Sequence, residues 1–136
     1  MALAQRMAQA GEEVIFTGGE GEESLLEKVQ KMGRKNIHIL PAGGLTLREF
    51  AAVISQAKVM VSNSTGPLHM AVALGVPTLS FYPNAPIQTS PKRWGPWGDS
   101  KTNGVLTPKE RDGPMSSISV DEALGKLKQI LSADSE

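Results

Sequence analysis

Residues 58–83, KVMVSNSTGPLHMAVALGVPTLSFYP, decide the fold, because an apolar run, a polar turn, a short apolar helix and a second apolar run follow one another. The runs Lys58–Ser62 and Thr78–Tyr82 predict two buried strands, and Pro67–Leu74 predicts the helix between them. Proline is tolerated in the first turn of a helix, and Gly75 provides a stop. A strand, a helix and a second strand in this order are typical of a parallel pair.

The same alternation continues on both sides of this stretch. Two further strands are predicted at Val14–Thr17 and Asn36–Leu40, and further helices at Met1–Ala10, Ser24–Met32, from Thr46 onward, and at Ser119–Leu131. The last two helices begin with capping boxes, Thr46 with Glu49 and Ser119 with Glu122. Pro83–Pro114 is one long segment rich in proline and glycine, with no predicted strand or helix. We therefore predict an α/β fold with a Rossmann-like parallel sheet covered by helices on both faces.

Composition narrows the class of protein. The 136 residues correspond to one domain, and 14 basic side chains balance 14 acidic ones, which argues against a strongly basic nucleic-acid-binding face. There is no cysteine and there are only two histidines, far apart in sequence, so we expect no metal cluster and no cofactor. No apolar run approaches the roughly 20 residues of a membrane span, and the N-terminus lacks the pattern of a secretory signal. We therefore expect a cytoplasmic domain.

The turn between the strand and the short helix predicts an anion site. Gly66 permits close approach to the backbone, the helix N-terminus favours negative charge, and Ser64 and Thr65 add hydroxyl donors, so a diphosphate would fit. The alternative is an ordinary polar turn in which one hydroxyl caps the helix. His69, one turn into the helix, is either structural or part of this site. A hydrolase dyad of Ser64 and His69 is disfavoured, because the G-x-S-x-G elbow is absent.

These residues also carry a resemblance to a known family. The matching positions are Ser64-Thr65-Gly66-Pro67-Leu68-His69, then Ala71 and Ala73, then Leu74-Gly75-Val76-Pro77 and Phe81-Tyr82-Pro83. They resemble the motif of glycosyltransferase family nine, which includes the heptosyltransferases of lipopolysaccharide core assembly: an apolar strand, Asp-Thr-Gly-x-x-His, an Ala-rich helix ending in Leu-Gly-x-Pro, and a second strand. The resemblance extends from about Val14 to Leu131 and weakens after Pro91.

The resemblance implies a GT-B enzyme in which two Rossmann-like domains face each other across a cleft. It implies that this chain is the C-terminal domain, which binds the nucleotide sugar, and that an N-terminal domain binds the acceptor and carries the general base. A first helix without a preceding strand also leads us to expect a domain cut from a larger protein. We therefore expect residues 1–136 to be a single domain that binds its donor and has no significant transfer activity alone.

Within the motif, the resemblance implies contacts with the donor. The diphosphate and sugar are expected at Thr65, Gly66 and the backbone of Pro67 and Leu68, although Pro67 has no N–H to donate. His69 is expected to line the donor site without acting as the base. Ser64 stands where the family often has Asp, which weakens the expected contact with the sugar hydroxyls.

Outside the motif, the resemblance implies a site for the nucleoside. Glu22 is expected to hold the ribose, and the loop Pro41–Leu45, with Gly43 and Gly44, is expected to wall the adenine. The alternative for Glu22 is that it belongs to a solvated acidic first turn that complements the helix dipole. The alternative for Gly43 and Gly44 is an ordinary flexible turn.

The segment RWGPWG and the lysine before it contain two further candidates. Lys92 and Arg93 could steer the donor diphosphate or the acidic acceptor. Trp94 and Trp97 could cover a sugar face, but we favour the interpretation in which they pack on the domain.

The function that follows is binding of ADP-heptose within a heptosyltransferase that transfers heptose to the lipopolysaccharide inner core. The acceptor would reach this site through the missing domain, and the full protein would be cytoplasmic, peripheral at the inner membrane and without a transmembrane segment. One alternative is a domain of another GT-B enzyme, a UDP-sugar transferase or epimerase. Another is a non-catalytic ligand-binding domain.

Overall fold

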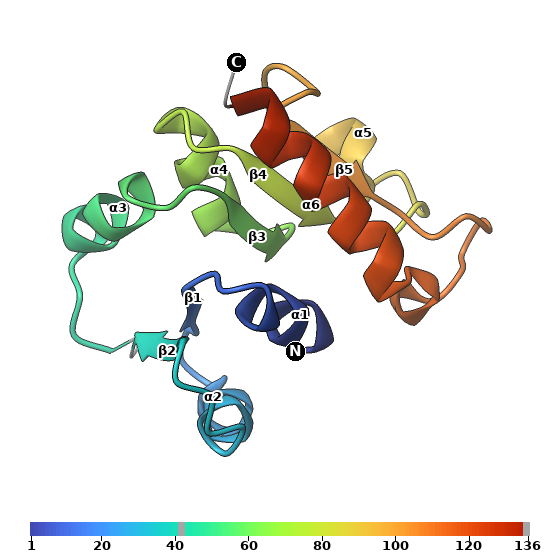
Figure 1. The fold of residues 1–136 in the computed structure, drawn as a ribbon. Coiled ribbons are helices and arrows are strands. Elements are labelled where there is room, and N and C mark those ends of the chain that lie inside the picture. Colours follow the sequence, from blue (N-terminus) through green and yellow to red (C-terminus); the bar gives the residue numbers. More distant parts are fainter. Residues whose placement is uncertain (41–42, 135–136) are drawn as a thin grey trace. The chain divides into compact units, whose positions relative to one another are not determined.

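Helices and strands alternate along the chain, and the described strands pair in parallel (Figure 1). The computed structural model describes residues 1–40 and 43–134. The chain divides into two compact units, unit 1 from Met1 to Thr46 and unit 2 from Leu47 to Glu136. Parallel strands separated by helices are what the apolar runs of the sequence predict, and that prediction is confirmed.

Unit 1 contains two helices and a two-stranded parallel sheet. Its elements are α1 (Ala2–Gln9), β1 (Val14–Thr17), α2 (Glu23–Gln30) and β2 (Ile37–Leu40). The strands are in register from Val14 opposite Ile37 to Thr17 opposite Leu40, so both end at the same edge. Val29 of α2 is buried, since the helix turns one apolar side inward.

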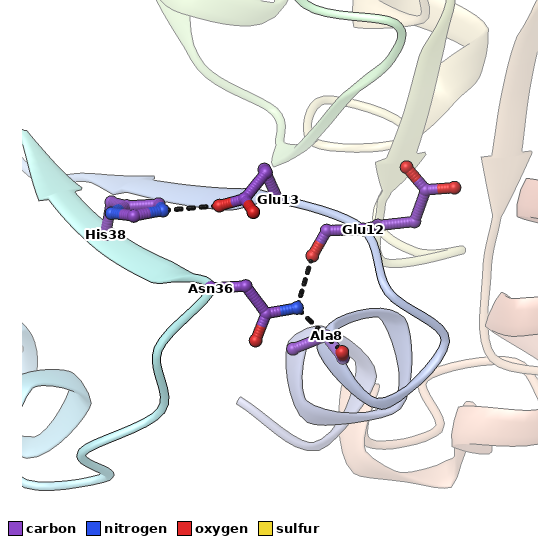
Figure 2. Close-up of polar contacts among 5 residues, drawn as sticks. All are labelled: Ala8, Glu12, Glu13, Asn36 and His38. Atoms are coloured by element: carbon purple, nitrogen blue, oxygen red, sulfur yellow. Dashed lines mark hydrogen bonds and ion pairs between the residues drawn. The ribbon is translucent and has the colours of Figure 1, made fainter.

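The side-chain amide of Asn36 ties the parts of unit 1 together (Figure 2). Its Nδ2 donates to the carbonyl oxygens of Ala8 at 2.7 Å and Glu12 at 2.9 Å, and so joins the end of α1 and the following loop to the start of β2. Beside it, Nε2 of His38 on β2 lies 2.5 Å from Oε2 of Glu13. The two Asn36 bonds thus connect the last turn of α1 and the loop that follows it to β2.

Unit 2 contains a three-stranded parallel sheet in the order β3-β4-β5. Its elements are α3 (Leu47–Ser55), β3 (Met60–Asn63), α4 (Gly66–Ala73), β4 (Thr78–Phe81), α5 (Pro91–Trp94), β5 (Asn103–Leu106), a 3-10 turn (Met115–Ser117) and α6 (Val120–Asp134). Gly75 has φ of +73°, so it adopts the left-handed conformation that ends a helix, as predicted. The N-terminus of α6 also matches prediction, because the Ser119 hydroxyl accepts from the backbone N–H of Glu122 at 3.0 Å.

The core of unit 2 lies around the central strand β4. Thr78, Leu79 and Ser80 are buried, because α4 and α6 both contact this strand. The two buried hydroxyls have partners on β5: Thr78 donates to Oδ1 of Asn103 at 2.9 Å, and Ser80 donates to the carbonyl of Gly104 at 3.1 Å. Each hydroxyl therefore avoids the penalty of an unsatisfied buried polar group.

The segment Pro83–Pro114 differs from its prediction. It contains the short helix α5 and the whole strand β5, whereas the sequence indicated neither. The strand reads Asn-Gly-Val-Leu, with too few apolar or β-branched residues to predict a strand locally. Pairing with β4, from Thr78 opposite Asn103 to Phe81 opposite Leu106, supplies what the local sequence lacks.

Candidate functional site

The carboxyl edge of the sheet in unit 2 carries the turn that the sequence singles out. β3, β4 and β5 are parallel and end in register at Asn63, Phe81 and Leu106. The loops that follow these strands therefore leave the sheet at one edge, which is where open parallel sheets bind ligands. Ser64 and Thr65 form the first of these loops and lead directly into α4.

Thr65 occupies the N-cap of α4 without capping it through its side chain. Its backbone is extended, with φ of −139° and ψ of 164°, and its hydroxyl makes no bond to the first turn of the helix. Instead, Oγ1 of Thr65 lies 2.9 Å from Oγ of Ser62 on β3. The backbone N–H of Leu68 donates to the carbonyl of Thr65 at 3.2 Å. The alternative of an ordinary side-chain cap is therefore wrong for Thr65.

The space over Gly66 is open. A β-carbon built on Gly66 would have no atom within 4 Å, and Ser64 and Thr65 beside it are exposed. A ligand can therefore come close to the backbone at this turn.

The remaining motif residues of α4 differ in what they can offer a ligand. Leu68 is fully buried in the core, and Pro67 is half-buried. The imidazole of His69 is exposed, and in the part of the chain that the structure describes it has no hydrogen-bond partner.

In unit 1, the loop after β1 uses two of its carboxylates locally. Oε2 of Glu22 accepts the N–H of Gly19 at 2.6 Å, and Oε1 of Glu23 accepts the N–H of Gly21 at 3.1 Å. Backbone hydrogen bonds, from Glu23 itself and from Gly21, hold the pKa of the Glu23 carboxyl below its ordinary value. Glu20 is exposed and, within the described residues, its carboxylate has no such bond. Two carboxylates of the loop, Glu22 and Glu23, thus stabilise its turn, and Glu20 is exposed beside them.

A shallow depression in unit 1 joins this loop to the next one. It has a volume of about 230 Å³ and is lined by Gly19, Glu23, Leu26, Glu27, Gln30, Ile39 and Gly43. Gly43 and Gly44 are exposed, and Gly44 has φ of +123°, a conformation that favours glycine. The structure thus brings Gly43 to the loop after β1, whereas Glu22 and Gly44 are outside the lining. Pro41 and Ala42 of the predicted adenine loop lie outside the described residues.

Lys92 and Arg93 lie on α5, and both side chains are exposed. The Arg93 guanidinium stacks on the ring of Trp94, 5.3 Å from its centroid. Trp94 is also held by hydrogen bonds, because its Nε1 donates to the carbonyl of Gln88 at 2.8 Å and its carbonyl accepts from Tyr82 at 2.5 Å. Trp97 is 89% exposed, so the prediction that it packs on the domain is wrong.

Neither a metal site nor a membrane span is found in the described part of the chain. No three His, Asp or Glu side chains among residues 1–40 and 43–134 gather where they could hold a metal ion. Within the same residues, no helix is both long and apolar enough to cross a bilayer.

Comparisons with known proteins identify the family. The model of glycosyltransferase family 9 (heptosyltransferase) matches residues 1–117. Lipopolysaccharide heptosyltransferase 1 of Pseudomonas aeruginosa is 34% identical over 101 residues, which cover 74% of this chain and 27% of that protein. The chain spans roughly a third of the length of the curated relatives it matches.

Solved structures agree on the fold. The chain resembles a family 9 glycosyltransferase of Veillonella parvula with a TM-score of 0.81 and 21% identity, over 97% of this chain and 40% of that one. It also resembles the structure of an E. coli heptosyltransferase with ADP-2-deoxy-2-fluoro heptose. The TM-score is 0.63 and the identity 21%, over 98% of this chain and 36% of that one. These similarities confirm the predicted fold class, alternating α/β with parallel strands as in part of a GT-B heptosyltransferase. The chain belongs to glycosyltransferase family 9, the heptosyltransferase family.

Proposed function

We propose that the chain is the donor-binding domain of a heptosyltransferase that uses ADP-heptose and extends the lipopolysaccharide inner core. The family description names heptosyl transfer, and the relative in Pseudomonas aeruginosa is named for lipopolysaccharide. One similar E. coli structure contains an ADP-heptose analogue. Together they favour ADP-heptose as the donor over a UDP-sugar.

We propose that residues 1–136 are one C-terminal domain of a larger two-domain enzyme. The share of its relatives that the chain covers, between 27% and 41%, supports this interpretation. The N-terminal domain would bind the lipopolysaccharide acceptor and provide the general base. The acceptor hydroxyl would then attack the anomeric carbon of the heptose and ADP would leave. The chain alone would bind the donor without transferring the sugar.

The observation that carries the proposal is the open turn at the start of α4. Thr65 is at the N-cap but does not cap, and the space over Gly66 is empty, so the Gly66 N–H and the Ser64 and Thr65 hydroxyls can donate to a diphosphate. Leu68 contributes less, because its N–H already donates to a carbonyl. These donors would stabilise the charge that develops on the leaving diphosphate. His69, exposed one turn away, would line the sugar.

The nucleoside would lie against the loops after β1 and β2. Gly43 and Gly44 would approach the adenine, and a carboxylate of the acidic loop would accept from the ribose hydroxyls. Glu22 is the proposed ribose ligand, because among the described residues only its Oε2 has a partner, the N–H of Gly19. Glu20 is the second candidate, since it projects from the same turn without a partner among the described residues.

Lys92 and Arg93 would supply positive charge that steers the diphosphate or the acidic acceptor. In the full protein we place the reaction in the cytoplasm, peripheral at the inner membrane.

The test is an NMR titration of the 15N-labelled chain with ADP and, separately, with UDP. The proposal expects shifts at Gly43, Gly66 and Thr65 with ADP, and weaker ones with UDP. Glu22→Gln is expected to weaken ADP binding, and Glu20→Gln is its matched comparison from the same loop. A loss with Glu20→Gln alone would transfer the ribose role to Glu20.

Three outcomes would count against the proposal. Stronger binding of UDP would favour a UDP-sugar enzyme. No response to either nucleotide at millimolar concentration would refute donor binding by this chain. Transfer of heptose by the chain alone would refute the division of labour between two domains.

A further inference from the structure

Ser62 and Thr65 form a hydroxyl pair across the junction of β3 and α4. The two oxygens are 2.9 Å apart, and either residue can be the donor. Capping does not explain the pair, since the Thr65 hydroxyl makes no bond to the first turn of α4. The contact instead links a residue of the sheet to the exposed residue that opens the helix.

We infer that Ser62 is a positioning residue for the anionic group of the ligand. It donates its hydrogen to Oγ1 of Thr65 and thereby turns the hydrogen of the Thr65 hydroxyl toward a phosphate oxygen. This inference rests on the proposed function, because it assigns a role within the same site. Ser62 itself does not touch the ligand.

The chemistry of the two groups gives the pair its direction. A hydroxyl has one hydrogen to donate and two lone pairs, and a single bond between two hydroxyls can run either way. An ionised phosphate oxygen only accepts. When it approaches Thr65, the hydrogen of Thr65 must point to the ligand, so the bond within the pair must run from Ser62 to Thr65.

The positions of the two residues explain why Ser62 can orient Thr65. Ser62 is partly buried, and its strand is paired in register with β4, where Ser80 lies opposite. Thr65, by contrast, is exposed to solvent. Without the Ser62 hydroxyl, Thr65 is free to rotate and to cap α4, which is the usual role of threonine at this position. A capping rotamer points its oxygen at the helix and away from the ligand.

The test measures the Kd of ADP and of adenosine for the 136-residue chain and a set of variants. Ser62→Ala is expected to weaken ADP binding by roughly three- to ten-fold, as the loss of one hydrogen bond would, and to leave adenosine binding unchanged. Ser62→Thr keeps a hydroxyl on a residue that suits a strand and is expected to restore the affinity for ADP. Ser55→Ala is the matched control, because that hydroxyl also donates one local hydrogen bond, to the carbonyl of Ala52 at 2.7 Å, in the same unit.

A double-mutant cycle with Thr65→Val identifies the route of the effect. If Ser62 acts through Thr65, Ser62→Ala will add little to the loss caused by Thr65→Val, and additive losses would overturn the inference. Unchanged ADP binding in Ser62→Ala, an equal loss for adenosine, or no rescue by Ser62→Thr at an unchanged melting temperature would also overturn it. Failure of the unaltered chain to bind ADP would refute the proposed function, and this inference with it.

Discussion

The close packing of α6 against β5 leaves no room for a side chain at Gly104. A β-carbon there would lie 2.7 Å from Cδ1 of Ile130, 3.1 Å from Cε of Lys126 and 3.3 Å from Cδ1 of Leu79. The first distance is too short for any real contact, and Ile130 is fully buried, so its end cannot swing into solvent. Gly104→Ala must therefore displace α6 or force a strained rotamer.

The magnitude follows from two opposing terms. Overpacking of a filled core destabilises by about 1–3 kcal/mol. Replacing glycine by alanine at a conformation that alanine tolerates stabilises by about 0.4–1 kcal/mol through the unfolded chain. Gly104 does not have positive φ, so both terms apply. We expect Gly104→Ala to lower the free energy of unfolding by about 1–2 kcal/mol.

Urea denaturation followed by circular dichroism measures this change, and a second substitution tests its cause. Ile130→Val deletes Cδ1, the atom that the new β-carbon meets, at a cost of about 0.5–1.5 kcal/mol by itself. Because it also removes the clash, the double variant should be clearly more stable than the sum of the two losses predicts. Gly125→Ala on α6 is the control: nothing lies within 4 Å of its built β-carbon, and we expect a gain of up to about 1 kcal/mol. A neutral or stabilising Gly104→Ala, or additive losses in the double variant, would refute the packing argument.

Three further predictions concern local contacts. Asn36→Asp keeps the shape of the side chain but removes the amide N–H groups that donate to two carbonyls, so it should destabilise unit 1 by about 1–3 kcal/mol. Amide hydrogen exchange in α1 and β1 would measure this loss, and unchanged protection would contradict the prediction. The pKa of Glu23 is lowered in the folded chain, so its contribution to stability is present above its ordinary value of 4.5 and is lost as the pH falls through the folded pKa. Glu23→Gln should flatten this part of the stability profile between neutral and acid pH, and an unaltered profile would count against the turn. Ser119→Ala removes the N-cap of α6 and should cost about 1 kcal/mol in urea denaturation, whereas Ser117→Ala, just before it, should cost less.

The three glutamates of the loop after β1 are the same residue type but have different roles in the structure. Three glutamates within four residues predict an anionic loop after β1, and the sequence offered Glu22 as the ribose ligand. In the structure, Glu22 and Glu23 each accept a backbone N–H from a neighbouring glycine. That leaves Glu20 as the acid without such a bond in the described residues. Only the turn conformation distinguishes these three carboxylates, and a turn of glycines permits several conformations.

Most of the secondary structure and the family could be predicted from the sequence by itself. Apolar runs separated by glycine, proline and capping serines are local signals, and they placed the strands β1, β2, β3 and β4 and the helices α1, α2, α3, α4 and α6 within a few residues. The residues from Ser64 to His69 carried the resemblance to the family, because they follow its motif in residue type and order.

The tertiary structure decided what depends on partners distant in sequence. Asn103–Leu106 forms the strand β5 because it pairs with β4. This pairing cannot be predicted from the Pro/Gly-rich segment that contains β5. The Thr65 hydroxyl does not cap α4, because it is hydrogen-bonded to the Ser62 hydroxyl across the turn. Trp97 is exposed, although aromatic side chains usually gain free energy by burial. Local sequence determines which conformation a segment prefers, but the contacts made by neighbouring elements determine which side chains remain available to a ligand.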